Sequence, residues 1–168
     1  IASAWQQIGR AGRRGKVSAS IMVPSALAMD QFLAANPDWF NGPAPSFGDE
    51  SARLLVAGLA PGRTGANRTG RPFTGDHAGW MLYETLLKTG FAQGKYEARP
   101  DDGLTLVDCM ISNAVRCAPP GNKPETSEEN ACRPFLTARL EALPNLKVIV
   151  TLGDVARRNV LKAIGLKA

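Results

Sequence analysis

Apolar runs alternate with amphipathic stretches along the chain from Ala52 onward. The run ARLLVAGLA (52–60) is continuous in apolar residues, as expected for a strand that is buried on both faces of a parallel sheet. Two further strands are predicted over LTLVDCMISNAV (104–115) and KVIVTLG (147–153). Amphipathic stretches at 75–90, 126–143 and 154–165 predict the helices between and after them. This β-α-β-α-β-α order predicts an α/β fold, with a central parallel sheet between two helical layers.

The helical stretches also carry end signals. Gly90 is expected to end the first helix, and Thr126 or Ser127 to open the second, which has acidic residues in its first turn. The residues predicted for the inner face of the first helix are Trp80, Leu82, Tyr83, Leu86 and Leu87.

The first forty residues have a different pattern. A strand-like run (16–24) leads to a helix-like run (25–40), for which Ser25 is a suitable N-cap. The stretch NGPAPSFGDES, rich in Gly, Pro, Asn and Ser, then predicts a linker. We therefore expect an N-terminal segment over 1–42, a linker over 43–51 and the main domain over 52–168.

Composition narrows the class of protein. The chain has 168 residues, a net charge of +5 and a pI of about 9.4, a balance that suits a polyanionic partner. No apolar run is long enough to span a bilayer, so no membrane partner is expected and a cytoplasmic location is the default. The chain begins with Ile and reads as a fragment or a processed piece. Its odd number of cysteines, three, argues against a disulfide framework.

The loop GLAPGRTGANRTGRPFTGD, Gly58 to Asp76, carries the strongest functional signal. Its five glycines, two prolines and three arginines oppose a helix and predict a rigid cationic loop directly after a strand. Ligands of open α/β sheets bind beyond the carboxyl ends of the strands, which would bring this loop beside Asn113–Pro124 and the turn at Gly153. An aromatic ring, an amide and several cations together suit a nucleobase on a phosphate backbone. The side chains expected to meet DNA are Arg63, Arg68, Arg71, Arg116 and Lys123.

This loop, followed by DCMISNAVRCAPPGNKPETSEENACRPFL, resembles the iron–sulfur uracil-DNA glycosylases, specifically their family-five (type b) branch. The resemblance covers about residues 43–168. It implies an enzyme that flips uracil, or another deaminated base, out of DNA and hydrolyses its N-glycosidic bond. It also implies that Asp76 positions water or stabilises the developing sugar cation, that Asn113 discriminates uracil, and that Phe73 stacks on the flipped base. Gly58, Ala60 and Pro61 match the tight turn that shapes the uracil pocket.

The resemblance further implies a structural four-iron four-sulfur cluster, for which Cys117 and Cys132 match two of the four thiolates. The other two belong upstream of the first motif, where residues 1–51 contain no cysteine, so we expect the cluster to be absent or unstable here. Cys109 is expected to pack as a small apolar side chain. The family's histidine motif follows a fourth strand, and the chain ends before it, so the sheet is expected to lack its last strand. His77 does not match that motif and is expected on the helix surface.

The segment WQQIGRAGRRG resembles the last conserved motif of superfamily-two (DEAD/DEAH-like) helicases, whose arginines contact nucleotide phosphate. Arg10 and Arg13 hold the matching positions. The nucleotide-binding loop of such motors is absent from the sequence, which leaves the segment as a helicase-like tail.

Several residues also have a structural interpretation. Capping of the next helix would by itself explain Asp76, and closing a turn would by itself explain Asn113. Phe73 could belong to the core. The arginine-rich loop could be a generic phosphate-tolerant loop. Two alternatives to the glycosylase therefore stay open, a catalytically inactive nucleic-acid-binding remnant and a fragment of a helicase fusion. The oligomeric state and the strandedness of the DNA are not predicted.

Overall fold

The structure is a computed structural model that describes residues 33–75 and 77–167. The predicted strand at 16–24, the predicted N-cap Ser25, and Asp76, Arg10 and Arg13 lie outside the described residues. The chain divides into two units after Pro37, and the fold below is that of the unit that begins at Asp38.

The centre of this unit is a four-stranded sheet with the order β1-β5-β2-β6. Its strands are β1 (Phe47–Gly48), β2 (Leu54–Gly58), β5 (Cys109–Asn113) and β6 (Val148–Thr151). Strand β2 pairs in parallel with both β5 and β6, whereas β1 pairs antiparallel with β5. The stretch predicted as a linker therefore contains a strand, because Phe47 and Gly48 bond the outer edge of β5.

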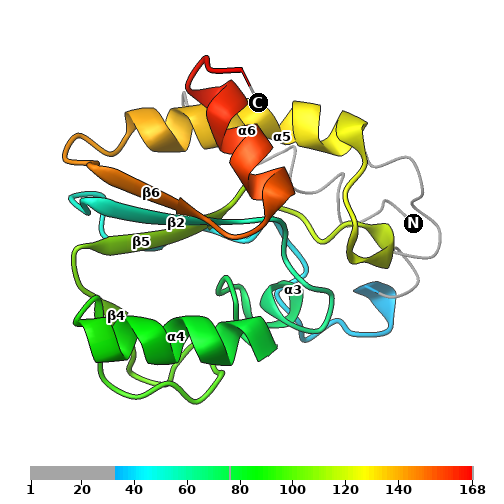
Figure 1. Ribbon diagram of the computed structural model, residues 1–168. Helices are drawn as coiled ribbons and strands as arrows, with labels where there is room; N and C mark the ends of the chain where they lie inside the picture. Colours follow the sequence, from blue (N-terminus) through cyan, green and yellow to red (C-terminus); the bar gives the residue numbers. More distant parts are fainter. Residues whose placement is uncertain (1–32, 76, 168) are drawn as a thin grey trace, which may run out of the picture. The chain divides into compact units, whose positions relative to one another are not determined.

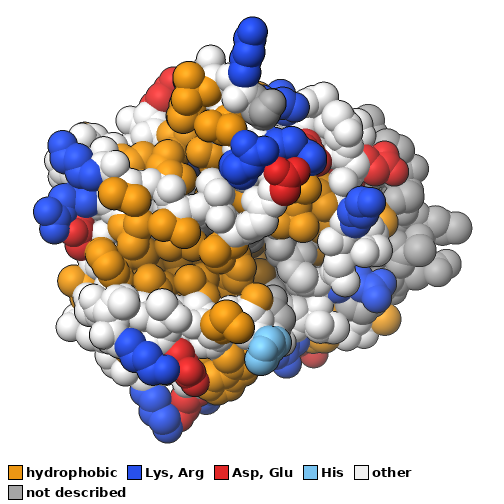
Figure 2. Space-filling model, viewed as in Figure 1, with side chains coloured by type: hydrophobic (Ala, Val, Ile, Leu, Met, Phe, Trp, Pro, Cys, Tyr) orange, Lys and Arg blue, Asp and Glu red, His pale blue; other side chains and the backbone are white. Residues whose placement is uncertain are grey.

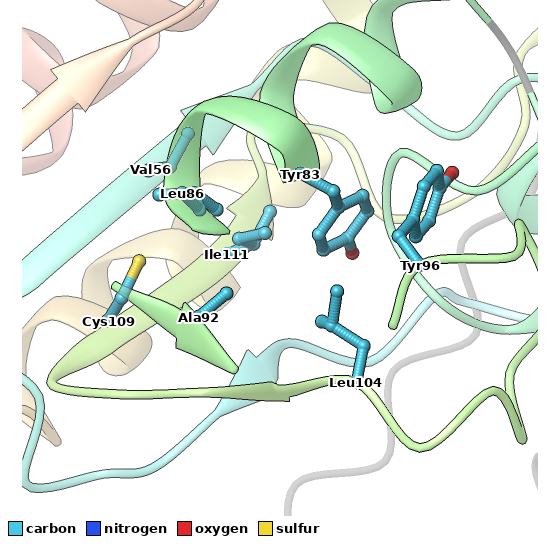
Figure 3. Close-up of a cluster of buried hydrophobic side chains, with 8 residues drawn as sticks. All are labelled: Val56, Tyr83, Leu86, Ala92, Tyr96, Leu104, Cys109 and Ile111. Atoms are coloured by element: carbon cyan, nitrogen blue, oxygen red, sulfur yellow. The ribbon is translucent and has the colours of Figure 1, made fainter. Parts of the chain in front are cut away.

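Helices cover both faces of the sheet (Figure 1). Helix α4 (His77–Thr89) lies on one face, and α5 (Thr126–Glu141) and α6 (Asp154–Ala163) lie on the other. The α4 face holds a buried cluster that includes Val56, Tyr83, Leu86 and Ile111 (Figure 3). The α5 and α6 face is sealed by smaller apolar clusters around Leu55 and Leu136. The predicted three-layer α/β sandwich is confirmed.

The predicted strand over 104–115 is two strands. Strand β4 (Thr105–Leu106) pairs with β3 (Ala92–Gln93) in a separate two-stranded sheet, and β5 begins only at Cys109. The break falls at Asp108, whose φ is +53° and whose carboxylate accepts hydrogen bonds from the backbone N–H and the Nε of Arg53. An apolar run cannot reveal such a break, because residues on both sides of it are apolar.

Some predicted element ends also differ. Helix α5 begins at Thr126, one of the two residues predicted to open it, and Glu125 before it is the N-cap. The carboxylate of Glu128 accepts the Glu125 N–H at 2.7 Å. In the loop predicted to contain no helix, α3 (Ala66–Thr69) forms one turn and ends at Gly70, whose φ of +76° favours glycine. A 3₁₀ turn, η1 (Pro120–Asn122), follows β5 in the Pro-rich loop.

Strand β6 is the edge strand of the sheet within the described part of the chain. The side chains of Val148, Val150 and Leu152 are exposed, and apolar surface gathers over β6 in Figure 2. Among the described residues, no helix combines the length and the apolar character that crossing a bilayer requires.

Candidate functional site

The candidate site lies at the carboxyl ends of β2 and β5, where Gly58 and Asn113 are partners in the parallel ladder. The two loops that leave these strands stay together. The N–H of Ala114 donates to the carbonyl of Gly58 at 2.8 Å, and the N–H of Arg63 donates to Oδ1 of Asn122 at 3.2 Å. The first two predicted loops therefore meet. On the other side, β6 follows β2 up to Leu152, whose N–H donates to the carbonyl of Ala57 at 2.8 Å.

Gly58 leaves no room for a side chain between its own backbone and the side chains of Asn113 and Phe73. A Cβ atom at this position would lie 2.5 Å from Oδ1 of Asn113 and 2.6 Å from Cε2 of Phe73. Real Cβ atoms do not approach other atoms so closely, so only glycine fits between the amide and the ring. The sequence predicted these three residues as parts of one pocket, and the structure brings them together.

Asn113 carries an unsatisfied polar atom. Its side chain is 5% exposed, and no donor in the described part of the chain reaches its buried Oδ1. An unpaired buried acceptor costs about 1–3 kcal/mol relative to one that is hydrogen-bonded. Such an atom at the end of a strand, beside an aromatic ring, suits a ligand that brings its own N–H donor.

Phe73 has a backbone conformation that is unusual for its residue type. Its φ is +56°, in the left-handed region, where a non-glycine residue is strained. Its carbonyl accepts a hydrogen bond from the hydroxyl of Tyr96 at 3.1 Å. Helix α4 approaches the same carbonyl so closely that a Cβ at Gly79 would overlap it. Phe73 is half-buried, and the surrounding structure fixes its ring against Gly58.

The residues before and after Phe73 are also held. The hydroxyl of Tyr83 donates to the carbonyl of Pro72 at 2.7 Å, and Nε of Arg71 donates to Oγ1 of Thr74 at 3.1 Å. Arg71 in turn makes two hydrogen bonds to the carboxylate of Asp102, at 2.8 and 2.7 Å. Every residue of the turn Arg71–Thr74 is therefore tied to a partner.

Arg71 and Asp102 form a buried ion pair. Their side chains are 4% and 0% exposed, and the guanidinium lies 5.2 Å from the ring centroid of Tyr83 and 5.4 Å from that of Tyr96. The hydrogen bonds from Arg71 hold the pKa of Asp102 well below its usual range. Burial would lower the pKa of Arg71, but Asp102 and the two tyrosines raise it overall. The expectation that Arg71 contacts DNA phosphate does not fit this burial, so Arg71 is not part of the DNA surface we propose below.

Tyr96 and Asp102 are residues that the sequence reasoning missed. Both lie in the segment between Gly90 and β5, which has no strong pattern, and nothing local marks them as partners of the Gly-rich loop. Tyr83 was predicted only as part of the inner face of α4. On that face Tyr83 and Leu86 are buried as predicted, but Trp80 is 44% exposed and packs edge-on against Tyr96.

The other predicted cationic side chains vary in exposure. Arg63, Arg68 and Lys123 are exposed. Arg116 is half-buried, and its Nε donates to the carbonyl of Ala44 at 3.3 Å. Of the turn residues, Pro61 is fully buried and Ala60 is half-buried. Asp76 lies outside the described residues, directly before α4, and His77 is exposed at the start of that helix, as predicted.

Cys117 and Cys132 are buried and interact electrostatically, and Cys109 packs in the cluster under α4, as predicted. Burial, with a smaller contribution from Cys132, raises the pKa of the Cys117 thiol to about 12. In the described part of the chain, no group of three or more Cys, His, Asp or Glu side chains is arranged to hold a metal. Two thiols do not make the four-thiolate set of an iron–sulfur cluster, so the described residues alone do not fit that group.

Comparisons with known proteins identify the family. Residues 45–167 match the family model of the uracil DNA glycosylase superfamily. A type-5 uracil-DNA glycosylase of Thermus thermophilus is 47% identical over 131 residues, which are 78% of this chain and 59% of that protein. A type-5 enzyme of Pyrobaculum aerophilum is 41% identical over 127 residues, 76% of this chain and 56% of the relative. A type-4 enzyme of Thermotoga maritima is 37% identical over 110 residues, 65% of this chain and 49% of the relative.

The chain spans between half and three fifths of the length of these relatives. The matching region includes both loops of the candidate site and all four strands of the sheet. The chain therefore belongs to the uracil DNA glycosylase superfamily.

Proposed function

We propose that this chain is the base-recognition part of a type-5 uracil-DNA glycosylase, which hydrolyses the N-glycosidic bond of uracil in DNA. The buried and unpaired Oδ1 of Asn113 is the observation that carries this proposal. The identity of the chain to two type-5 enzymes, 47% and 41%, supports the assignment to that branch.

Asn113 suits uracil better than cytosine because of hydrogen-bond polarity. Uracil presents an N3–H donor next to an O4 acceptor, and an asparagine amide can accept from the first and donate to the second. Cytosine presents an N3 acceptor and an N4–H₂ donor, which would leave the Asn113 oxygen without a donor at N3. An enzyme site whose buried polar groups stay unpaired with the wrong substrate rejects that substrate strongly.

Phe73 supplies the stacking surface. Its ring lies against Gly58, beside the Asn113 amide, so a base that bonds to Asn113 can rest on the ring. Stacking of a base on an aromatic side chain contributes about 1–3 kcal/mol and accepts any base. Selection in this site therefore comes from Asn113, whereas Phe73 supplies affinity.

The chemical step breaks the bond between C1′ of the sugar and N1 of uracil. The bonding electron pair leaves with N1, positive charge develops on the sugar, and water adds to C1′ with loss of a proton. We assign Asp76 to the sugar side, where a carboxylate offsets the positive charge or orients the water. Arg63, Arg68, Arg116 and Lys123 are assigned to the phosphates of the DNA.

A four-iron four-sulfur cluster would take two of its thiolates from Cys117 and Cys132. The described residues offer no further ligands to it, so we expect this chain alone to lack a stable cluster. No step of the reaction above depends on the cluster.

Excision from a uracil-containing single strand tests the proposal, with anaerobically prepared protein and strand scission by alkali as the readout. We expect scission by the wild-type chain and none by Asp76→Ala or Asn113→Ala. Asn113→Ala should be at least as stable as wild type in urea, because it removes an unsatisfied atom. Lost activity together with retained stability would separate a recognition role from a packing role.

Absence of scission by the wild-type chain, with salt-sensitive DNA binding retained, would favour the catalytically inactive nucleic-acid-binding alternative. Uracil release that persists in Asn113→Ala would contradict the assignment of Asn113.

A further inference from the structure

A hollow of about 430 Å³ lies beside helix α3, outside the Gly58–Phe73–Asn113 pocket. Its volume is in the range of about 300–1,000 Å³ that is usual for ligand sites. One aromatic ring, two arginines and one carboxylate contribute to its lining. The residues that line it are Asp38, Phe40, Arg68, Thr69, Ala98, Arg99 and Pro100.

Phe40 presents a fixed aromatic surface in this hollow. Its side chain is 47% exposed, although it belongs to the unit with the buried core. A Cβ at Gly70 would lie 2.9 Å from the ring, and one at Gly42 would lie 3.2 Å from it, so two glycines make room for the ring. The Phe40 N–H donates to the carbonyl of Arg68 at 3.1 Å, which ties the ring to α3. A half-exposed phenylalanine that is held in this way is available as a stacking surface.

Two exposed arginines, Arg68 and Arg99, line the hollow together with the ring. Arg68 extends toward the end of the Gly-rich loop, since its guanidinium would be 3.2 Å from a Cβ at Gly75. Arg99 comes from the segment that follows Tyr96, and its guanidinium also pairs with Glu97 at 2.7 Å. Asp38 adds a carboxylate, which would repel a phosphate but can accept from the amino group of a base.

We propose that this hollow is a second nucleotide site, in which an unpaired base of DNA stacks on Phe40 while its phosphates meet Arg68 and Arg99. Aromatic rings interleaved with cations are the arrangement by which proteins hold single-stranded nucleic acid. The proposal rests on the proposed function, because it takes DNA as the ligand. It adds a site for a nucleotide next to the flipped base, on the same loop that runs from Gly58 to Phe73.

The position of the loop explains why the two sites would cooperate. Gly58 and Phe73, at opposite ends of the loop, shape the base pocket, whereas α3 in its middle carries Arg68 and Thr69 into the hollow. If a neighbouring nucleotide of the DNA is held on Phe40, the target base loses less conformational entropy when it binds to Asn113. Unpaired DNA should therefore bind better than duplex DNA, whose bases cannot reach Phe40.

Binding of a fluorescent, uracil-free thymine single strand to the whole chain, followed by anisotropy at several salt concentrations, tests the second site. Phe40→Leu keeps an apolar side chain but removes the ring, and we expect at least about five-fold weaker binding. Arg68→Gln and Arg99→Gln should each lower the slope of log affinity against log salt by about 0.7 for a single strand.

Matched controls lie at the other end of the sheet. Ile164, after α6, is as exposed as Phe40, at 47%, and Lys147 precedes β6. Ile164→Ala should leave the affinity unchanged, and Lys147→Gln should leave the salt slope unchanged. Equal affinity of Phe40→Leu and wild type for the thymine single strand would contradict the proposed second site. Failure of the wild-type chain to bind this DNA would contradict it as well. The probe carries no uracil, so this binding assay tests the second site alone. The excision assay tests the roles of Asn113 and Asp76, and the two proposals can therefore fail independently.

Discussion

The hydroxyl of Tyr96 donates to the carbonyl oxygen of Phe73 at 3.1 Å, across 23 residues of sequence. This contact joins the segment after β3 to the turn that carries the proposed stacking ring. The residue that bears the ring is strained, and Tyr96 is one of the groups that hold it in place. If Phe73 stacks on a base as proposed, recognition of that base depends also on residues that never touch it.

Removal of the Tyr96 hydroxyl tests this dependence. Tyr96→Phe should lower the free energy of unfolding by about 1 kcal/mol, the usual contribution of one hydrogen bond. It should also raise KM for a uracil-containing strand more than it lowers kcat, because the ring loses its fixed position. Thr85→Ala is the matched control, since the Thr85 hydroxyl donates only within α4, to Met81 at 2.7 Å. Equal effects of both changes on KM would contradict a role for Tyr96 in positioning Phe73.

The buried ion pair should show a strong asymmetry between single and double substitution. Arg71→Met or Asp102→Asn leaves one buried group without its partner, which costs about 3–5 kcal/mol. The double variant leaves neither charge, so it should be more stable than the sum of the single losses predicts. Urea unfolding of the four proteins measures the coupling. Strictly additive losses would show that Arg71 and Asp102 do not stabilise one another.

The ion pair also predicts how stability depends on pH. Hydrogen bonds from Arg71 lower the pKa of Asp102 in the folded state. A carboxylate with a lowered folded pKa contributes stability above its unfolded pKa of about 3.9, and this contribution is lost as the pH falls toward the folded pKa. Wild type should therefore lose stability below about pH 4 more steeply than Asp102→Asn. If the urea midpoints of wild type and Asp102→Asn fell by the same amount from neutral to acid pH, the predicted contribution of Asp102 would be contradicted.

Gly58→Ala should disrupt the candidate site more than the fold. The new methyl group would meet Asn113 and Phe73 at 2.4–2.6 Å, so one of them must move away. We expect loss of uracil excision with a smaller loss in the free energy of unfolding. Gly103→Asn serves as the control, because open space surrounds Gly103 and Asn tolerates its φ of +76°. Full activity of Gly58→Ala would show that the ring and the amide need not both touch Gly58.

The cysteine thiols should be slow to react in the folded chain. All three are buried, and burial raises the pKa of Cys109 to about 11 and that of Cys117 to about 12. A raised thiol pKa means less of the reactive thiolate at pH 8. Iodoacetamide in chelator-containing buffer should modify these cysteines slowly until urea unfolds the protein, as followed by mass spectrometry. Rapid native modification of Cys117 would show that this thiol is accessible.

Much of the fold follows from local pattern. The three parallel strands and the helices between them were predicted because buried strands are apolar throughout and helices repeat at a different period. The meeting of the two loops that begin at Gly58 and Asn113 followed from the rule that ligand-binding loops lie at the carboxyl ends of parallel strands. Strand β1 was missed because its two residues lie in a stretch rich in glycine and proline.

The site was predicted less completely because its support is not local. Arg71 was expected to contact DNA because its neighbours form a cationic loop, but it is buried against Asp102, which lies 31 residues away. No period or composition marks such a pair, since burial of Arg71 depends on how Tyr83 and Tyr96 pack around it. Asp108 likewise breaks an apolar run through contacts with Arg53, which lies 55 residues away.

The left-handed backbone of Phe73 implies a compromise between the thermal stability of the fold and the function of the ring. Glycine or asparagine would adopt its φ of +56° with less strain, which is about 1–3 kcal/mol for other residues. Either replacement would remove the ring that faces Gly58 and Asn113. A selection for heat resistance alone would therefore favour Phe73→Gly or Phe73→Asn, whereas a selection for base recognition would restore the aromatic residue.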